Sequence, residues 1–303
     1  MGGSNIYWGA QFDTLADGAR LVAVDLLGFG ESPKPDVGYS PRHHADALAA
    51  CLRELDINEP AVVVGHSMGT LVALALATYH PELVDSVVAI APPIYASRVD
   101  GIRHIRAMGT LEGLMAFGST SRLMCGWMCR HRELAGRLAP LIEPSLPAPI
   151  VRAGVQHTWA SYSQSMDELI LACDAAGWLV NLAKPVRLIA ALDDRVPDIP
   201  LRSRLRELND LVTLDIWSQG GHHLLLTEPA KCVAAIRLAL DDFVRSPRSK
   251  PTPAGAPPAQ ELMPITALLC ETDGTSAVAT RDAETRAPFS RRAPLKRDAG
   301  SSQ

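Results

Sequence analysis

Short apolar runs alternate with amphipathic stretches along the first 245 residues of the chain. Runs rich in Val, Ile, Leu and Ala have the length of buried strands, and they lie at residues 21–25, 61–64, 85–90, 185–191 and 211–216. Strands that are apolar on both faces are typical of a parallel sheet covered by helices. The pattern therefore predicts an α/β fold with a mostly parallel sheet.

Two other segments have the periodicity and the start signals of helices. Ser40 before Pro41 is an N-cap followed by proline in the first turn, and the segment Thr227-Glu228-Pro229 begins a later helix in the same way. Apolar residues then recur every three or four positions and give each helix one buried face. These residues are Ala45, Leu48, Leu52 and Leu55 in the first helix, and Val233, Ile236, Leu240 and Phe243 in the second.

The strand at residues 61–64 runs directly into Gly65-His66-Ser67-Met68-Gly69 and then into an apolar helix at residues 70–77. A G-x-S-x-G turn between a strand and a helix holds its serine in a strained conformation, and the glycines let the two elements approach closely. Ser67 is therefore a predicted nucleophile, and the amide of Met68 is predicted to bind the oxyanion that forms on an attacked carbonyl. A glycine-rich turn with an incidental serine would fit the five residues alone, but their flanking strand and helix favour the nucleophile.

A serine needs a base to take its proton, and candidates lie at the ends of two later strands. The strand at residues 185–191 ends at Asp193 and Asp194, and the strand at residues 211–216 runs into His222 and His223. The carboxyl ends of parallel strands meet at one edge of a sheet, where such sites form. The strand ends alone leave open which aspartate and which histidine take part.

Four motifs, in order along the chain, resemble the α/β-hydrolase fold family. Residues 25–32 resemble its D-x-x-G-x-G-x-S turn, residues 80–84 the segment after the nucleophile helix, and residues 221–229 the histidine loop with the helix behind it. Residues 193–197 resemble the acid loop, usually G-x-x-D-x-x-V-P, with Ala190 where the glycine is usual. Serine, acid and histidine also follow one another in the order of this family.

The resemblance implies a catalytic triad. The distance from the acid to the following proline selects Asp193, with Asp194 as the alternative. The distance from the histidine to the proline of the last helix selects His222, and His223 is expected to pack or to meet solvent. Together with Ser67, these two residues form the implied triad.

The resemblance also implies how the chain is divided. Residues 1–98 and 185–245 would form the two parts of the core, and residues 99–184, which lack strand patterning, would form a helical cap. Met and Trp residues in the cap would make an apolar acyl pocket. Residues 246–303 are rich in Pro, Ala, Ser and charge and are predicted to form a disordered tail, in which the apolar patch at residues 262–270 could at most form a short docking helix.

The beginning of the chain departs from the family. In the family, three strands precede the segment that matches Trp8, and the loop after the third strand carries His-Gly and a second oxyanion amide. This chain begins with Met1-Gly2-Gly3-Ser4, which resembles the end of that loop. We therefore expect the first strands to be missing and the strands at residues 21–25 and 61–64 to have unpaired edges.

Composition fits a soluble, enzyme-sized domain better than a nucleic-acid binder, because the 303 residues carry a net charge of −4 with 47% hydrophobic and 20% charged residues. No apolar run approaches the roughly 18 residues of a transmembrane segment. Cys125, Cys129 and His131 lack a fourth partner for a metal site. The scattered cysteines fit a reducing compartment, which favours the cytoplasm.

These features predict a serine hydrolase that cleaves a small, mostly apolar ester or related acyl substrate without a cofactor or a metal. Ser67 attacks the carbonyl, His222 transfers the proton, Asp193 orients His222, and the amide of Met68 binds the oxyanion. Carbon–carbon bond hydrolysis, acyl transfer and perhydrolysis use the same residues and stay open. The alternative hypothesis is a truncated, non-catalytic remnant of the fold.

Overall fold

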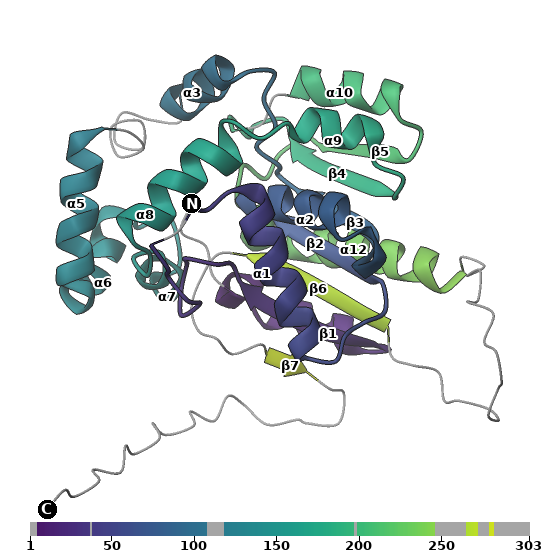
Figure 1. Ribbon diagram of the computed structural model, residues 1–303, viewed down its shortest axis with the longest axis horizontal. Coiled ribbons are helices and arrows are strands. Elements are labelled where there is room, and N and C mark those ends of the chain that lie inside the picture. Colours follow the sequence, from purple (N-terminus) through teal and green to yellow (C-terminus); the bar gives the residue numbers. More distant parts are fainter. Residues whose placement is uncertain are drawn as a thin grey trace, which may run out of the picture.

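The computed structural model describes residues 5–36, 38–107, 118–196 and 199–245, together with two strands at residues 265–271 and 279–281. Its centre is one sheet with helices on both faces, and a group of helices lies beside the sheet (Figure 1). This architecture confirms the prediction of an α/β fold with a mostly parallel sheet.

The sheet has seven strands in the order β5-β4-β3-β2-β6-β1-β7. All neighbouring pairs are parallel except β1 with β7, which is antiparallel. The strands are β1 (Ala19–Asp25), β2 (Ala61–His66), β3 (Val84–Ile90), β4 (Val186–Ala191), β5 (Val212–Trp217), β6 (Ile265–Glu271) and β7 (Ala279–Arg281). Those from β1 to β5 coincide closely with the apolar runs of the sequence. Every residue of the central strand β2 is buried, as in a parallel sheet covered on both faces, whereas the edge strand β5 has exposed positions.

The two faces of the sheet build two separate cores. Within β2, Val63 belongs to the cluster on one face, and Val62 and Val64 belong to the cluster on the other. This alternation follows from the period of two along a strand. All three side chains are fully buried, so β2 is fixed from both sides at the point where it leads to Ser67.

One face is covered by α1 (Pro41–Glu54), α2 (Met68–Tyr79), α9 (Ala175–Asn181) and α10 (Ile199–Leu208), and the other by η1 (Asn5–Trp8), η2 (Ala10–Ala16) and α12 (Pro229–Arg245). The short helices η3 (Pro81–Leu83) and α11 (Leu224–Thr227) precede β3 and α12. The side chain of Ser40 accepts a hydrogen bond from the amide of His43 at 3.3 Å, as its predicted role of N-cap to α1 requires.

The described residues between β3 and β4 lie in helices and connecting loops and contain no strand. They form α3 (Arg98–Ala107), α5 (Ser119–Arg130), α6 (Arg132–Ile142), α7 (Ala148–Ala153), α8 (Trp159–Gln164), the π-helical turn η4 (Ser165–Ile170) and α9. In Figure 1, α5, α6, α7 and α8 gather at one side of the sheet. The arrangement suits a cap, although the limits of 99–184 remain a prediction.

The segment that the sequence assigned to a disordered tail contributes to the middle of the sheet. Strand β6 pairs with β1 from Ile265 to Glu271 and with β2 from Ala267 to Cys270. The expectation of unpaired edges on β1 and β2 is therefore wrong, and the patch at residues 262–270 contains a strand rather than a helix. An apolar run between two free edges satisfies the backbone groups of both neighbours, which a helix could not do. The other residues of 246–303, apart from β7, lie outside the described part.

Within the described ranges, no helix is long and apolar enough to cross a membrane.

Candidate active site

Ser67 lies at the sharp turn between β2 and α2. Its backbone has φ 51° and ψ −123°, which is a strained conformation for a residue other than glycine. Gly65 permits the turn, because a Cβ at this position would lie only 2.5 Å from the carbonyl carbon of Gly69. The amide of Ser67 is anchored to the carbonyl of Ile90 on β3 at 2.9 Å. The local structure is thus the predicted turn, with the serine hydroxyl placed at the carboxyl edge of the sheet.

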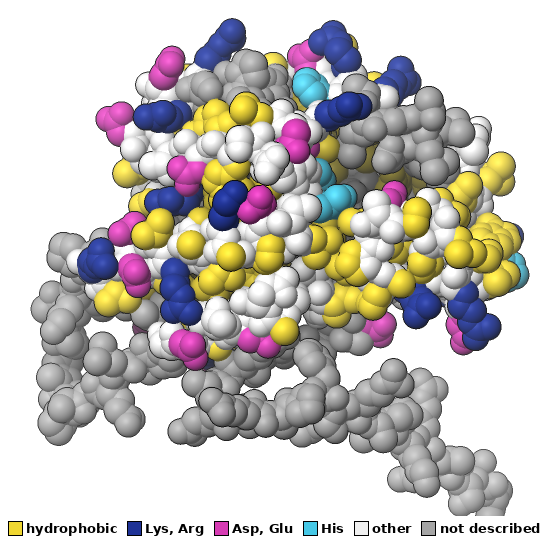
Figure 2. Space-filling view, turned by 180° about the vertical axis from the view of Figure 1, so that it is seen from behind, with side chains coloured by type: hydrophobic (Ala, Val, Ile, Leu, Met, Phe, Trp, Pro, Cys, Tyr) yellow, Lys and Arg dark blue, Asp and Glu magenta, His cyan; other side chains and the backbone are white. Residues whose placement is uncertain are grey.

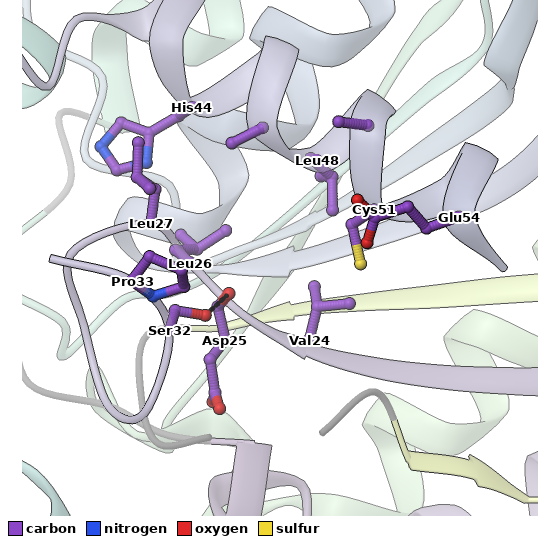
Figure 3. Close-up of a pocket in the computed structure, with 12 residues that line it drawn as sticks. Val24, Asp25, Leu26, Leu27, Ser32, Pro33, His44, Leu48, Cys51 and Glu54 are labelled. Carbon is purple, nitrogen blue, oxygen red and sulfur yellow. Dashed lines mark hydrogen bonds between the residues drawn. The ribbon is translucent and has the colours of Figure 1, made fainter. Parts of the chain in front are cut away.

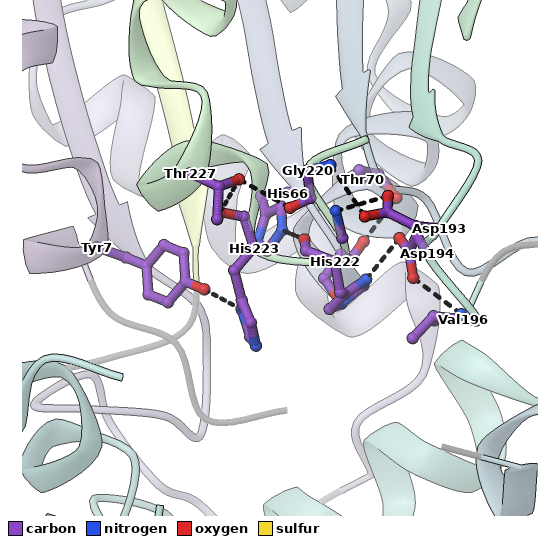
Figure 4. Close-up of polar contacts among 12 residues, drawn as sticks. Tyr7, His66, Thr70, Asp193, Asp194, Val196, Gly220, His222, His223 and Thr227 are labelled. Atoms are coloured by element: carbon purple, nitrogen blue, oxygen red, sulfur yellow. Dashed lines mark hydrogen bonds and ion pairs between the residues drawn. The ribbon is translucent and has the colours of Figure 1, made fainter. Parts of the chain in front are cut away.

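His222 contacts both Ser67 and an aspartate, and Figure 4 shows its contact with Asp194. Its Nε2 lies 2.9 Å from Ser67 Oγ, and its Nδ1 lies 3.0 Å from Asp194 Oδ2. A carboxylate can only accept, so Nδ1 carries the proton and Nε2 is free to accept from the serine hydroxyl. Of the two histidines left open by the strand ends, His222 therefore contacts Ser67.

Asp194, rather than Asp193, contacts His222, so the prediction that placed Asp193 there is wrong. The Asp194 side chain is completely buried, and its second oxygen accepts from the amide of Val196 at 2.9 Å. Residues adjacent in a loop point in different directions, and only one of two neighbouring aspartates can face the histidine. The spacing to the following proline did not determine which one.

Asp193 has a different partner in the same region. Its carboxylate accepts hydrogen bonds from the amides of Gly221 at 2.9 Å and Gly220 at 3.2 Å. These bonds, Gly221 first, lower the pKa of Asp193, because each favours the ionised carboxylate. The two aspartates thus have different partners. Asp194 contacts the imidazole of His222, and Asp193 binds the backbone of the loop that precedes His222.

Burial is the main influence on the protonation of His222. It lowers the pKa of His222 from its ordinary value, because the charged imidazolium loses its hydration, and the nearby Asp194 raises the pKa in part. His222 is therefore neutral at neutral pH and able to accept a proton. The buried carboxylate would stabilise the imidazolium once the proton has moved.

Met68 is the first residue of α2 and is buried. The first amides of a helix have no partner within the helix, and the helix N-terminus favours negative charge. Met68 thus occupies the place expected of an oxyanion donor. Gly2, Gly3 and Ser4, which resemble part of a second oxyanion loop, lie outside the described residues.

Tyr7, His66 and His223 form an aromatic cluster beside His222 that no motif of the sequence indicates. His66 Nε2 donates to the carbonyl of His222 at 2.8 Å, and the two imidazoles lie 5.2 Å apart. Tyr7 stacks on His66 with ring centroids 5.4 Å apart, and its hydroxyl forms a hydrogen bond with Nδ1 of His223 (Figure 4). His223 therefore packs against Tyr7, and burial beside His222 and His66 lowers its pKa to about 3.

A cavity of about 400 Å³ opens over Ser67, between the sheet edge and the helices that follow β3. Ser67, His222 and His223 line one side of it, and residues of those helices, which include Met128, Tyr162, Met166 and Ile170, line much of the rest. Met128 and Met166 match the expectation of an apolar pocket with flexible walls. His223 thus faces the space above the serine, a role that the sequence did not indicate.

The cavity offers little positive charge. No Lys or Arg occurs among the described residues that line it, and Glu143 is their single carboxylate. Burial lowers the pKa of His157 to about 4 and raises the pKa of Tyr162 and of Cys125 to about 12. These three side chains are therefore neutral at neutral pH, so the walls suit an uncharged ligand.

A second cavity, of about 270 Å³, lies between the end of β1 and α1 (Figure 3). Its described lining includes Asp25, His44 and Cys51 but neither Ser67 nor His222. His44 is almost fully buried, its Nε2 lies 3.2 Å from Ser165 Oγ, and burial lowers its pKa to about 3. The contacts among Ser67, His222 and Asp194 therefore lie at the first cavity and not at this one.

The described residues hold no cluster of three or more His, Cys, Asp or Glu side chains suited to a metal ion. The sulfur atoms of Cys125 and Cys129 lie 4.0 Å apart, and Arg132 contacts the second of them. His131, the third residue of the metal pattern considered in the sequence, packs against Trp127 with the two rings tilted by 44°.

Comparison with known proteins places these residues in a family context. A family model of the alpha/beta hydrolase fold matches residues 1–113. The 2-(acetamidomethylene)succinate hydrolase of Mesorhizobium japonicum is 34% identical over 238 residues, which cover 75% of this chain and 80% of that protein. A crystal structure of E-2-(acetamidomethylene)succinate hydrolase has a TM-score of 0.62 and 20% identity, over 80% of this chain and 88% of that chain. The esterase RhEst1 from Rhodococcus sp. ECU1013 has a TM-score of 0.60 and 21% identity, over 79% and 87% of the two chains.

A plant relative matches a shorter stretch. BODYGUARD 4 of Arabidopsis thaliana, named a probable lysophospholipase, is 37% identical over 145 residues, which cover 44% of this chain and 35% of that protein. The match to BODYGUARD 1 covers 34% of that protein. The matched region thus spans about a third of the length of these plant relatives.

Proposed function

Because the chain belongs to the α/β-hydrolase fold family, we propose that it is a serine hydrolase that cleaves small, uncharged, mostly apolar esters. The observation that carries the proposal is the unbroken set of contacts from Ser67 Oγ through His222 to Asp194, at 2.9 and 3.0 Å. A serine at a strained turn, a neutral imidazole and a buried carboxylate are the parts that acyl transfer to serine requires.

The reaction proceeds in two halves. Ser67 Oγ attacks the ester carbonyl while His222 Nε2 takes the hydroxyl proton, and the oxyanion points at the amide of Met68. The carbon–oxygen bond to the alcohol then breaks, and His222 returns the proton to the leaving alkoxide. Water, deprotonated by the same imidazole, attacks the acyl-enzyme. The bond between the acyl carbon and Ser67 Oγ then breaks, His222 returns the proton to Oγ, and the acid is released. Asp194, which contacts Nδ1 at 3.0 Å, stabilises the imidazolium in both halves.

The walls of the cavity determine the proposed substrate class. An anionic acyl group would meet Glu143 and no lysine or arginine among the described lining residues. The neutral side chains of Met166, Tyr162 and Ile170 accept an apolar acyl chain instead. We therefore expect a preference different from that of the Mesorhizobium relative, whose name specifies a succinate derivative.

Two esters of equal chain length test this proposal. p-Nitrophenyl butyrate and mono-p-nitrophenyl succinate differ mainly in a terminal carboxylate, and kcat/KM should be higher for the butyrate by about tenfold or more, a difference worth roughly 1.4 kcal/mol. Glu143→Gln should narrow the difference, because it removes the one carboxylate among the described residues that line the cavity. A preference for the succinate ester would contradict the substrate class and leave the hydrolase intact.

The hydrolase itself is tested by Ser67→Ala, which should abolish hydrolysis of both esters. The matched control is Ser121→Ala, because Ser121 lines the same cavity and is also a buried serine, whereas the imidazole nitrogens of His222 contact Ser67 and Asp194. This control should retain turnover within about threefold, well under the tenfold that corresponds to 1.4 kcal/mol. Equal turnover by the Ser67→Ala variant and the unmodified chain would refute the proposed nucleophile.

A further inference from the structure

Helix α6 has an apolar stripe that faces solvent. Leu134, Leu138, Leu141 and Ile142 follow the spacing that normally marks the buried side of a helix, yet they are 47%, 39%, 76% and 65% exposed. The buried positions of α6 are instead the small residues Ala135 and Gly136. The sequence thus places large apolar side chains where a helix of an isolated globular protein would carry polar ones.

Helix α5, which packs beside α6, extends the same surface. Leu123, Met124 and Trp127 are 75%, 38% and 40% exposed. On the opposite side of α5, Cys125 and Met128 line the cavity above Ser67. Helix α5 is therefore apolar on both sides, and only its inner side is accounted for by the cavity.

These seven side chains of α5 and α6 form what we call the outer cap face. In Figure 2, hydrophobic side chains gather on the flank that corresponds to α5 and α6 in Figure 1, and basic side chains lie at the margin. Contiguous apolar surface of this kind commonly marks an interaction site, whereas single exposed apolar residues do not.

The charge around the outer cap face differs from that of the whole chain. Residues 118–158 contain five arginines and two glutamates, a net of +3, whereas the full chain has a net charge of −4. Arg122, Arg130, Arg137 and Arg152 are exposed. The segment thus combines a basic margin with an apolar surface that includes a tryptophan, as helices do that lie in the plane of a membrane surface.

We propose that the outer cap face binds the surface of an anionic phospholipid bilayer. The apolar side chains enter the boundary between headgroups and acyl chains, and the arginines contact lipid phosphates. The basic margin is the reason for choosing a lipid surface over an apolar protein partner or a second copy of the chain. The proposal concerns binding, and it does not depend on the proposed hydrolase activity.

Co-sedimentation with vesicles tests the proposal. The unmodified chain should bind vesicles made of equal amounts of phosphatidylcholine and phosphatidylglycerol more strongly than vesicles of phosphatidylcholine alone. The difference should shrink as salt is added, because salt screens the attraction between arginines and phosphates. Failure to bind either kind of vesicle would overturn the proposal.

Two groups of variants locate the surface. A triple variant with Leu123→Ser, Trp127→Ser and Leu141→Ser should lower the bound fraction at limiting lipid by about tenfold or more, since burying one such side chain already changes an equilibrium by about that factor. A second variant combines Arg122→Gln, Arg130→Gln and Arg137→Gln. Its bound fraction at limiting lipid should fall by about tenfold or more on the anionic vesicles and change little on phosphatidylcholine vesicles.

The matched control changes three exposed apolar residues outside the cap, with Leu208→Ser, Leu238→Ser and Val244→Ser, which are 64%, 50% and 59% exposed in the unmodified chain. Circular dichroism melts should show that all three triple variants fold. Equal vesicle binding by the apolar cap variant and the control would contradict the proposal. Light scattering tests self-association instead. A dimer that only the apolar cap variant dissociates, in a chain that does not bind vesicles, would overturn the lipid proposal in favour of self-association.

Discussion

Replacing Asp194 or Asp193 by asparagine gives a sharp comparison, because the two neighbours have the same chemistry and different partners. Asp194 is fully buried with one oxygen 3.0 Å from His222 Nδ1. An asparagine at this position keeps the shape but removes the charge that stabilises the imidazolium and fixes its tautomer. We expect kcat to fall by about 10⁴, the loss seen when a triad aspartate is neutralised, which equals roughly 5.5 kcal/mol of activation free energy.

Asp193→Asn should have a much smaller effect. The Asp193 carboxylate accepts from the amides of Gly220 and Gly221 and does not contact the imidazole. An asparagine oxygen can keep one of these hydrogen bonds, so the histidine loop loses part of its support and the chemistry keeps all its groups. We expect kcat to fall by less than about tenfold, which is far below the effect of removing a triad member.

The pH dependence of kcat/KM separates the two variants further. Activity requires neutral His222, so it is lost as pH falls through the pKa of this residue. Burial lowers that pKa and Asp194 raises it, so Asp194→Asn should move the acid limb of the profile to lower pH. Asp193→Asn should leave the limb in place. A larger loss from Asp193→Asn than from Asp194→Asn, with both variants folded by circular dichroism, would refute the assignment.

Three further predictions follow from other parts of the fold. His66→Ala removes the hydrogen-bond donor to the carbonyl of His222 and should lower kcat by about ten- to a hundredfold with little change in KM. His66→Asn should restore part of the lost kcat. Equal kcat for His66→Ala and the unmodified chain would exclude a positioning role for His66. A chain that ends at Arg245 lacks β6 and leaves buried backbone groups of β1 and β2 unpaired. Each unpaired group costs roughly 1–3 kcal/mol against a total stability of about 5–15 kcal/mol. This shortened chain should therefore be insoluble or melt at a much lower temperature, whereas a chain that ends at Arg281 should keep its solubility and melting temperature. Burial lowers the pKa of His44 to about 3, so below about pH 6.5 the unfolded state binds a proton at this residue and the folded state does not. The free energy of unfolding should therefore fall by on the order of 3 kcal/mol as pH drops from about 6.5 to 4. His44→Leu should flatten the pH dependence of the melting temperature, and an unchanged dependence would contradict this expectation.

The parts of the site that local sequence determines could be predicted. Gly65 and Gly69 fix the turn around Ser67 whatever the rest of the chain does, and the apolar runs fix β2 and α2 on either side. The order of serine, acid and histidine also reflects strand ends on one edge of the sheet. His222 followed from its spacing to the last helix, which is a local relation too.

The remaining features depend on contacts between distant segments. Whether Asp193 or Asp194 faces His222 depends on the path of one loop, and both fit the same motif to within a single residue. The hydrogen bond between Tyr7 and His223 joins residues 216 positions apart, so no local pattern signals it. Strand β6 occupies a place that the sequence left empty, because the apolar run at residues 265–271 lies inside a stretch whose overall composition is typical of disorder.

Mass spectrometry after treatment with a fluorophosphonate identifies the nucleophile of the site. The reagent phosphonylates serines that a neighbouring base activates, and we expect one adduct, on the peptide that contains Ser67. His222→Ala should abolish the adduct and His223→Ala should retain it, because Nε2 of His222 lies 2.9 Å from Ser67 Oγ and His223 is hydrogen-bonded to Tyr7. An adduct on another residue, or equal labelling of Ser67 in the His222→Ala variant and the unmodified chain, would contradict the proposed site.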